Sequence, residues 1–255
     1  MNKINPTIRF SDRVQYYIKY RPKYPKEILD FFKEELKLSI RHTIADIGSG
    51  TGFLSRLFLQ NGNVVYGVEP NKEMRQAAEK LLDQYPNFKS INGSAEFTDL
   101  ESRSIDFITA AQAFHWFDID VSRNEFKRIL KPKGWIILIW NERSETSLFL
   151  KAYEQLLKTF SADYQKVDHR NVNDKVLTQF FGSKNYKLKL FKNEQQFNFE
   201  GLKGRLLSSS YAPMEGHPNY QPMIAELQRI FTSYQQKGKV IFEYRTKVYF
   251  GKLEE

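Results

Sequence analysis

The sequence predicts an α/β protein whose core is a mostly parallel sheet. From residue 43 to residue 140, short runs of β-branched residues alternate with helical stretches, which is the pattern of consecutive βαβ units. A glycine-rich turn follows the first of these strands and leads into a helix. A further pair of strands near the C-terminus could form an antiparallel edge on the sheet.

Five strands, with helices between them, are expected at residues 43–47, 64–68, 88–91, 105–110 and 135–140. The second helix is the clearest, because Asn71 is a good N-cap residue and Met74, Ala78 and Leu82 share one apolar face. The helix before the last strand is expected to stop and turn at residues 131–134, Lys-Pro-Lys-Gly, since proline and glycine end helices.

Two segments flank this core. The basic N-terminal arm, residues 1–41, carries tyrosines around Arg21 and a helix expected over 26–38. The C-terminal part is expected to contain a helix around 148–160, a polar loop at 168–171, a strand near 187–197, a helical insertion at 201–236 and a strand at 240–250. We expect one domain over residues 1–255, in which the arm and the insertion either form a lid over the functional edge of the sheet or only cover the surface.

Composition excludes several classes of protein. The chain has no cysteine, which rules out disulfide scaffolds, thiol nucleophiles and cysteine-ligated metals. The longest apolar run, residues 135–140, is far shorter than the roughly 20 residues that a membrane-spanning helix needs. The N-terminus shows no apolar signal segment, so a cytoplasmic location is expected. His42, His169 and His217 lack metal-ligand spacing, and no metal is implied.

The formal net charge of +9 is spread along the chain. Residues 1–140 carry 21 basic and 17 acidic side chains, and residues 141–255 carry 18 and 13. The densest basic patch, Lys184, Lys187, Lys189 and Lys192, fits either a lysine-protected edge strand or a phosphate-binding surface. This even distribution argues against a nucleic-acid partner.

The glycine-rich turn is the most informative segment. Gly48, Gly50 and Gly52 let the backbone turn tightly and approach a ligand. The alternative interpretation is a tight strand-to-helix turn whose glycines bind nothing. A dinucleotide-binding motif would need glycine at position 53, where this chain has Phe53, and a P-loop would need lysine directly after Gly52. The sequence therefore disfavours both motifs. Glu69 ends the second strand, where a carboxylate can accept both hydroxyls of a ribose. A nucleoside without a pyrophosphate fits this pattern best.

Four segments together resemble the class I S-adenosylmethionine-dependent methyltransferases, and within them the type 11 group that includes trans-aconitate methyltransferases. They are residues 46–52, 67–71, 94–96 and 111–118. The resemblance implies a Rossmann-like sheet of seven strands in the order 3-2-1-4-5-7-6, with strand 7 antiparallel and helices on both faces. It also implies S-adenosyl-L-methionine as cofactor and S-adenosyl-L-homocysteine as product.

The resemblance further assigns cofactor-binding residues: Tyr20, Arg21, Asp46, Gly48, Ser49, Gly50, Gly52, Glu69, Pro70, Met74, Ser94, Ala95, Glu96 and Gln112. The glycine loop would line the methionine part, Glu69 would hold the ribose, and Pro70 and Met74 would flank the adenine. Ser94 departs from the family, in which many members carry aspartate at this position to accept from the adenine amine.

His115 is the candidate general base, with loop orientation as its alternative role. Trp116, Asn141, Arg143 and Tyr211 are the candidates for substrate binding. The expected activity is methyl transfer to an oxygen or nitrogen of a small molecule; RNA or protein methylation and non-catalytic cofactor binding are the alternatives. The Asn-Pro-Pro-Tyr type of loop, which binds planar amides, is absent after the fourth strand. The acceptor and the oligomeric state do not follow from the sequence.

Overall fold

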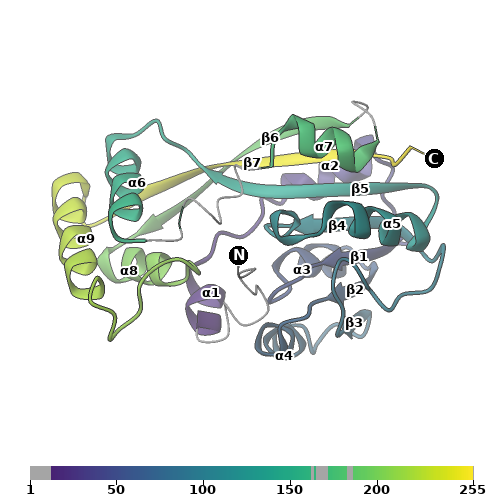
Figure 1. The fold of residues 1–255 in the computed structure, drawn as a ribbon, viewed down its shortest axis with the longest axis horizontal. Helices are drawn as coiled ribbons and strands as arrows, with labels where there is room; N and C mark the ends of the chain where they lie inside the picture. The colour runs from purple at the N-terminus through teal and green to yellow at the C-terminus, as the bar shows by residue number, and fades with distance from the viewer. Residues whose placement is uncertain (1–12, 162–163, 165–171, 183–185, 255) are drawn as a thin grey trace.

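Seven strands form one sheet in the order β3-β2-β1-β4-β5-β7-β6 (Figure 1). The computed structural model describes residues 13–161, 164, 172–182 and 186–254. The strands are β1 Thr43–Ile47, β2 Val64–Val68, β3 Phe88–Ile91, β4 Ile105–Ala111, β5 Leu130–Arg143, β6 Lys187–Phe197 and β7 Val240–Gly251. Strand β7 runs antiparallel to β5 and β6, and the other pairs are parallel. The expected strand order and fold class are therefore confirmed.

The helices that connect and cover these strands are α1 Val14–Tyr20, α2 Glu27–Glu35, α3 Phe53–Gln60, α4 Lys72–Leu81, α5 Ile119–Ile129, α6 Leu148–Phe160, α7 Asp174–Phe181, α8 Phe199–Leu207 and α9 Tyr220–Tyr234. The expected cap of α4 is present, since Asn71 Oδ1 accepts from Met74 N at 2.8 Å. Helices α1 and α7 were not expected from the sequence.

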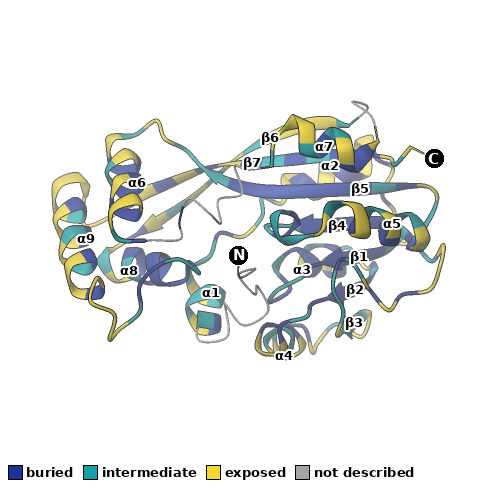
Figure 2. Ribbon diagram, in the orientation of Figure 1, coloured by how far each residue is buried: buried dark blue, intermediate teal, exposed yellow. Residues whose placement is uncertain are grey.

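Both faces of the parallel strands are buried. Ile136 and Leu138 of β5 contribute to the core that packs against α5 and α7, and Ile137 and Ile139 contribute to the core that packs against α2 and α3. Figure 2 shows this stretch of β5 as buried. Because successive side chains of a strand point to opposite faces, a continuous apolar run is what a doubly covered strand requires.

A third core holds a lid lobe that we define as α6, α8, α9 and the ends of the strands beneath them. Val240, Phe242 and Tyr244, in the first half of β7, pack with these helices, whereas Val248 and Phe250 of the same strand pack in the sheet core. Figure 1 shows the three helices grouped at one end of the molecule, and α1 lies against α8. The predicted insertion at 201–236 corresponds to α8 and α9.

Two local expectations were wrong. No helix lies between β3 and β4, where residues 92–104 form a loop. Helix α5 ends at Ile129 as expected, but the Lys-Pro-Lys-Gly segment at 131–134 is an irregular start of β5 and not a separate turn. The strand register shifts there, between the pairs Ile105–Leu130 and Phe107–Trp135, which absorbs the extra residues. The predicted polar loop at 168–171 lies outside the described residues.

Strand β6 is the edge of the sheet, and its Lys187, Lys189 and Lys192 side chains are exposed. Lys184, the other member of this basic patch, lies outside the described residues. Charged side chains on an edge strand oppose pairing with another chain. This placement agrees with the edge-strand interpretation of the patch.

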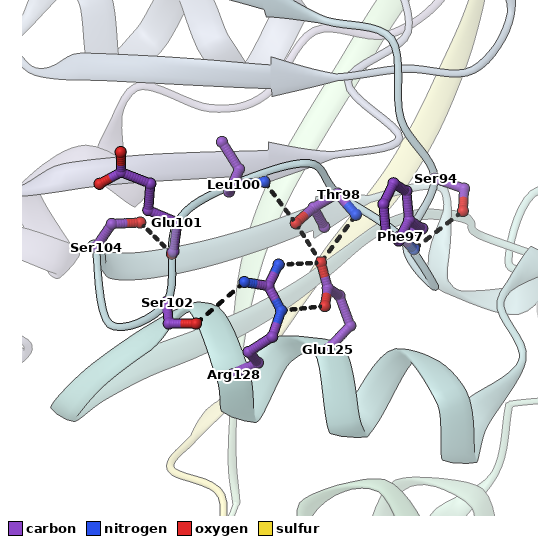
Figure 3. Close-up of polar contacts among 9 residues, drawn as sticks. All are labelled: Ser94, Phe97, Thr98, Leu100, Glu101, Ser102, Ser104, Glu125 and Arg128. Carbon is purple, nitrogen blue, oxygen red and sulfur yellow. Dashed lines mark hydrogen bonds and ion pairs between the residues drawn. The ribbon is translucent and has the colours of Figure 1, made fainter.

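The loop at 92–104 is fastened to α5 by Glu125 (Figure 3). Glu125 Oε1 accepts from Thr98 N at 2.9 Å and from Thr98 Oγ1 at 2.5 Å, and Arg128 Nε donates to Glu125 Oε2 at 2.7 Å. Burial of the carboxyl opposes its charge, but the Arg128 and Thr98 donors lower the pKa of Glu125 to about 2. One ionised side chain thus fixes a loop that has no regular secondary structure.

Replacing Glu125 tests this attachment. Glu125→Gln removes the charge that receives these hydrogen bonds, and we expect it to destabilise the protein by about 1–3 kcal/mol in urea unfolding. Glu226→Gln is the matched control, because Glu226 pairs with Arg229 at the same i,i+3 spacing on the solvent-facing side of α9. The control should change stability by less than about 0.5 kcal/mol. Equal effects of the two substitutions would contradict the loop attachment.

Candidate active site

Two adjoining cavities open at the carboxyl ends of the parallel strands. The loop cavity lies among the turns after β1, β2, β3 and β4 and is lined by Gly50, Glu69, Pro70, Asn71, Met74, Ser94, Ala95, Glu96 and Phe117. The lid cavity lies between the glycine turn, the arm and the lid lobe, and its lining includes Arg21, Tyr24, Asp46, Ser49, His115, Asn141, Arg143, Tyr164, Arg205, Tyr211 and Tyr244. Tyr17, Gly48, Ala111, Gln112 and Trp116 line both cavities. The two spaces therefore share a boundary made of these five residues.

The glycine turn is held by main-chain bonds and has no room for a side chain at Gly48. Gly48 N and Ser49 N both donate to Val68 O, at 2.8 and 3.1 Å. Gly48 has φ +67°, and a Cβ at this position would lie 2.5 Å from Ala113 Cβ. Glycine is therefore required both by the left-handed backbone and by the close approach of the loop after β4.

Glu69 joins the turn to the end of β2. Its side chain is only 8% exposed; Oε2 accepts from Gly50 N at 2.8 Å and Oε1 accepts from Asn71 N at 2.9 Å. Burial raises the pKa of Glu69, and these two hydrogen bonds counteract that shift. A carboxylate oxygen can accept two hydrogen bonds, so Glu69 can still accept from a ligand in the loop cavity.

The remaining walls of the loop cavity combine apolar faces with a polar edge. Pro70 and Met74 follow β2, and Ser94 and Glu96 belong to the turn after β3. Glu96 Oε1 accepts from Asp118 N at 2.9 Å, and Ser94 Oγ accepts from Phe97 N at 3.3 Å (Figure 3). The Glu96 contact holds the turn after β3 against the loop after β4, and the Ser94 contact lies within that turn.

Asp46 lies under the glycine turn and borders the lid cavity. It is 1% exposed, and its two oxygens accept from Ser55 Oγ at 2.7 Å and Thr109 Oγ1 at 2.9 Å. Burial raises the pKa of Asp46 to about 6, against the effect of these hydroxyl donors. The carboxyl links β1 to β4 and α3.

The loop after β4 carries the residues at the boundary of the two cavities. Gln112 has φ +57°, and its N–H donates to Ile139 O at 2.9 Å. Residues 114–116 form one 3₁₀ turn, in which His115 lies beside Trp116 with ring centroids 4.9 Å apart. A left-handed backbone at a non-glycine residue is uncommon and concentrates at functional sites, where the surrounding contacts hold it in place.

The arm reaches the cavities through α1. Tyr17 and Arg21 are one helical turn apart, and the Arg21 guanidinium lies 5.3 Å from the Tyr17 ring. Arg21 Nε and Nη2 donate to Ser208 O at 3.3 and 3.0 Å. The arm is thereby fixed to the end of α8 and closes one side of the lid cavity.

Comparison with known proteins places this geometry in a family. The model of the methyltransferase domain family matches residues 45–138. An uncharacterized methyltransferase of the fission yeast Schizosaccharomyces pombe is 27% identical over 94% of this chain and 95% of its own length. One from Bacillus thuringiensis is 30% identical over 60% of this chain and 68% of its own length. This chain is an S-adenosylmethionine-dependent methyltransferase.

The fold of this methyltransferase also matches solved structures. A protein of Anaeromyxobacter dehalogenans described as a type II methyltransferase superposes with a TM-score of 0.65, covering 92% of this chain and 100% of that one. Sequence identity is 18%, so the match shows the shared fold alone. The family cofactor is S-adenosyl-L-methionine. The loop cavity suits it, because a buried carboxylate, apolar walls and the backbone of Gly48 and Gly50 meet there.

Most of the predicted cofactor residues line one or both cavities, with two exceptions. Gly52 lines neither cavity; it begins α3 at φ +81°, and a Cβ there would lie 2.5 Å from Leu82 Cδ1, so it serves helix packing. Tyr20 also lines neither, because its ring covers Gly204 of α8. Tyr17, one turn before Arg21 on α1, lines both cavities. If residues 14–20 had been predicted as a helix, the spacing of four residues between Tyr17 and Arg21 would have placed Tyr17 on the same face as Arg21.

The predicted substrate residues all line the lid cavity. They differ in whether their polar atoms already have hydrogen-bond partners within the protein. The Asn141 amide is used by the fold: Oδ1 accepts from Thr246 Oγ1 at 2.5 Å and from Asn193 Nδ2 at 3.1 Å, and Nδ2 donates to Lys23 O at 3.4 Å. Sequence reasoning missed Arg205, which lies on α8 in the lid lobe. No local motif marks this arginine, because only the packing of α8 against β7 brings it to the cavity.

No helix within the described ranges combines the length and the apolar character needed to cross a membrane.

The raised pKa of Asp46 predicts a specific pH dependence of stability. The carboxyl titrates at 3.8 when unfolded and at about 6 when folded, so its stabilising contribution is complete below pH 3.8 and is lost as pH rises through 6. The loss amounts to roughly 3 kcal/mol. Asp46→Asn keeps a partner for both hydroxyls and should lose less stability than wild type between pH 4 and pH 7.5.

Urea unfolding of wild type and Asp46→Asn at pH 4 and pH 7.5 measures this difference. The other titrating groups are the same in both proteins, so their contributions to the pH dependence cancel. Asp83→Asn, at an exposed position on the surface, is the matched control. Parallel stability curves for wild type and Asp46→Asn would contradict the assignment.

Proposed function

We propose that this methyltransferase transfers the methyl group of S-adenosylmethionine to an oxygen or nitrogen of a small molecule bound in the lid cavity. The observation that carries the proposal is the shared boundary of the two cavities. Gln112, Trp116 and Tyr17 line both, so a donor held in the loop cavity and an acceptor held in the lid cavity would meet there.

The residues around the loop cavity support defined roles toward the cofactor. Glu69 would accept hydrogen bonds from the ribose hydroxyls, and Pro70 and Met74 would flank the adenine. The turn at 94–96 would meet the polar edge of the adenine. Gly48, Ser49 and Gly50 would line the methionine portion, and Arg21 can supply a guanidinium to its carboxylate. Asp46 would act beneath the turn by holding β1, β4 and α3 in place.

When bound, S-adenosylmethionine supplies an electrophilic methyl group on a sulfonium. Displacement at such a carbon needs alignment and exclusion of water, with reacting atoms about 3–3.5 Å apart. Trp116 would shield the boundary between the cavities from water. His115 lines the lid cavity beside it and would accept the proton that a neutral acceptor loses.

A small acceptor is favoured because the arm and the lid lobe are bonded together over the lid cavity. Arg13 Nη1 donates to Ser209 O at 2.6 Å and Arg13 Nη2 donates to Ala212 O at 2.8 Å. Arg21 adds its own bonds to Ser208 O. A macromolecule could reach the boundary only after these contacts opened.

Calorimetry with S-adenosylhomocysteine tests the cofactor roles. Glu69→Gln keeps the shape but removes the charged acceptor, and we expect affinity to fall about tenfold to hundredfold, since hydrogen bonds to charged groups contribute about 1.5–3 kcal/mol. Glu226→Gln, on the solvent-facing side of α9, should bind as wild type does. A screen of small acceptors with labelled cofactor then tests the acceptor class. Labelling of RNA or protein in place of every small molecule would overturn it, as would cofactor binding without any transfer.

Replacing His115 separates proton transfer from loop orientation. If His115 is the base, His115→Gln lowers kcat/KM by about 10²–10⁴ and removes the acidic limb of its pH profile, with S-adenosylhomocysteine affinity unchanged. His217→Gln, at an exposed position between α8 and α9, is the control. A pH profile that keeps the wild-type shape would exclude the base and assign His115 to positioning.

A further inference from the structure

Three arginines line the lid cavity, of which Arg205 is buried and Arg143 and Arg21 are half-buried. Arg205 projects from α8, Arg143 ends β5, and Arg21 comes from the arm. Arginine stays protonated in proteins, so each group carries its charge whether or not it is buried. The question is what balances these charges.

Arg205 has hydrogen-bond partners but no counter-charge in the described part of the chain. The residue is 4% exposed; Nε donates to Tyr244 OH at 3.0 Å and Nη1 donates to Ser209 Oγ at 3.1 Å. Both acceptors are neutral hydroxyls. Taking an arginine out of water costs several kcal/mol unless an opposite charge is close.

Arg143 and Arg205 are both neighbours of Tyr244. In the pairing of β5 with β7, Arg143 is opposite Tyr244, the residue that accepts from Arg205. Arg143 Nη2 donates to Glu154, but that carboxylate also lies 3.6 Å from Lys158. Arg143 Nε is buried and has no hydrogen-bond partner among the described residues. The pair therefore retains unused donors and excess positive charge.

Among the described residues, the acidic side chains that line the cavity do not cancel this charge. Asp46 is occupied by Ser55 and Thr109, and Glu142 pairs with Lys247 at 2.7 Å. Glu145 is exposed. The positive charge also acts on Tyr211, which lines the same cavity. Burial alone would raise the pKa of Tyr211, but Arg143, Arg205 and Arg21 lower it below its ordinary value.

We propose that Arg205 and Arg143 form an oxyanion-binding subsite for the methyl acceptor, which therefore carries a carboxylate or phosphate group. The inference rests on the proposed function and names the substrate class. Planar guanidinium groups bind such oxyanions with two parallel hydrogen bonds. With the oxyanion at α8 and the end of β5, the rest of the acceptor extends toward His115 and Gln112, where the two cavities meet. The subsite acts as an anchor that selects charged acceptors.

Calorimetry with three matched probes tests the subsite: benzoate, phenyl phosphate and the neutral isostere benzamide. Each is titrated into protein saturated with S-adenosylhomocysteine, at fixed ionic strength. We expect at least one anionic probe to bind tenfold or more tightly than benzamide, and the better of the two identifies carboxylate or phosphate chemistry. Arg205→Gln should abolish the difference, and Arg205→Lys should reduce it, because lysine keeps the charge but not the planar pair of donors.

Arg229→Gln, which removes an arginine from exposed α9, should leave all three affinities unchanged. Equal binding of benzoate, phenyl phosphate and benzamide to the wild type would overturn the subsite, as would unchanged selectivity in Arg205→Lys. These two results remain decisive if Arg205→Gln does not fold. Failure to bind S-adenosylhomocysteine in the first step would instead count against the proposed function, so the two failures are distinguishable.

Discussion

The hydrogen bond from Gly50 N to the Glu69 carboxylate joins the two loops on which the site is built. It connects the turn after β1 to the end of β2, while Gly48 N and Ser49 N bind Val68 O beside it. These bonds leave the turn no freedom to move away from the strand end, and Ala113 limits it from the other side. The shape of the loop cavity follows from this arrangement, since Pro70 and Met74 are placed by the same segment of chain.

A second constraint is the length of β7. One strand takes part in two cores: its first half packs under the lid helices, and its second half packs in the sheet. The lid lobe is therefore an extension of the sheet, and Tyr244, near the middle of the strand, lies at the lid cavity. This explains how residues from α8 and from the end of β5 come to the same place in the site.

The sequence predicted the sheet well because its signals were local or motif-based. The β-branched runs placed β1 to β4 nearly to the residue, and Glu69 and the glycine turn followed from a motif with a known geometry. The roles of Tyr20 and Gly52 could not be settled this way, because they depend on contacts with Gly204 and Leu82 on other elements. Arg205 was missed for the same reason. In the loop between β3 and β4, where a helix was expected, the attachment to α5 through Glu125 depends on a contact between distant parts of the chain and has no local signal.

The bonds between the arm and the lid lobe join residues far apart in the chain. Arg13 and Arg21 bind carbonyl groups 187 to 199 positions later. During synthesis, α1 must remain undocked until α8 and the residues after it have emerged, because its partners do not yet exist. Contacts of such long sequence separation form late, since the loop-closure entropy must be overcome first. The lid cavity is therefore completed at the end of folding, after the sheet that carries the glycine turn.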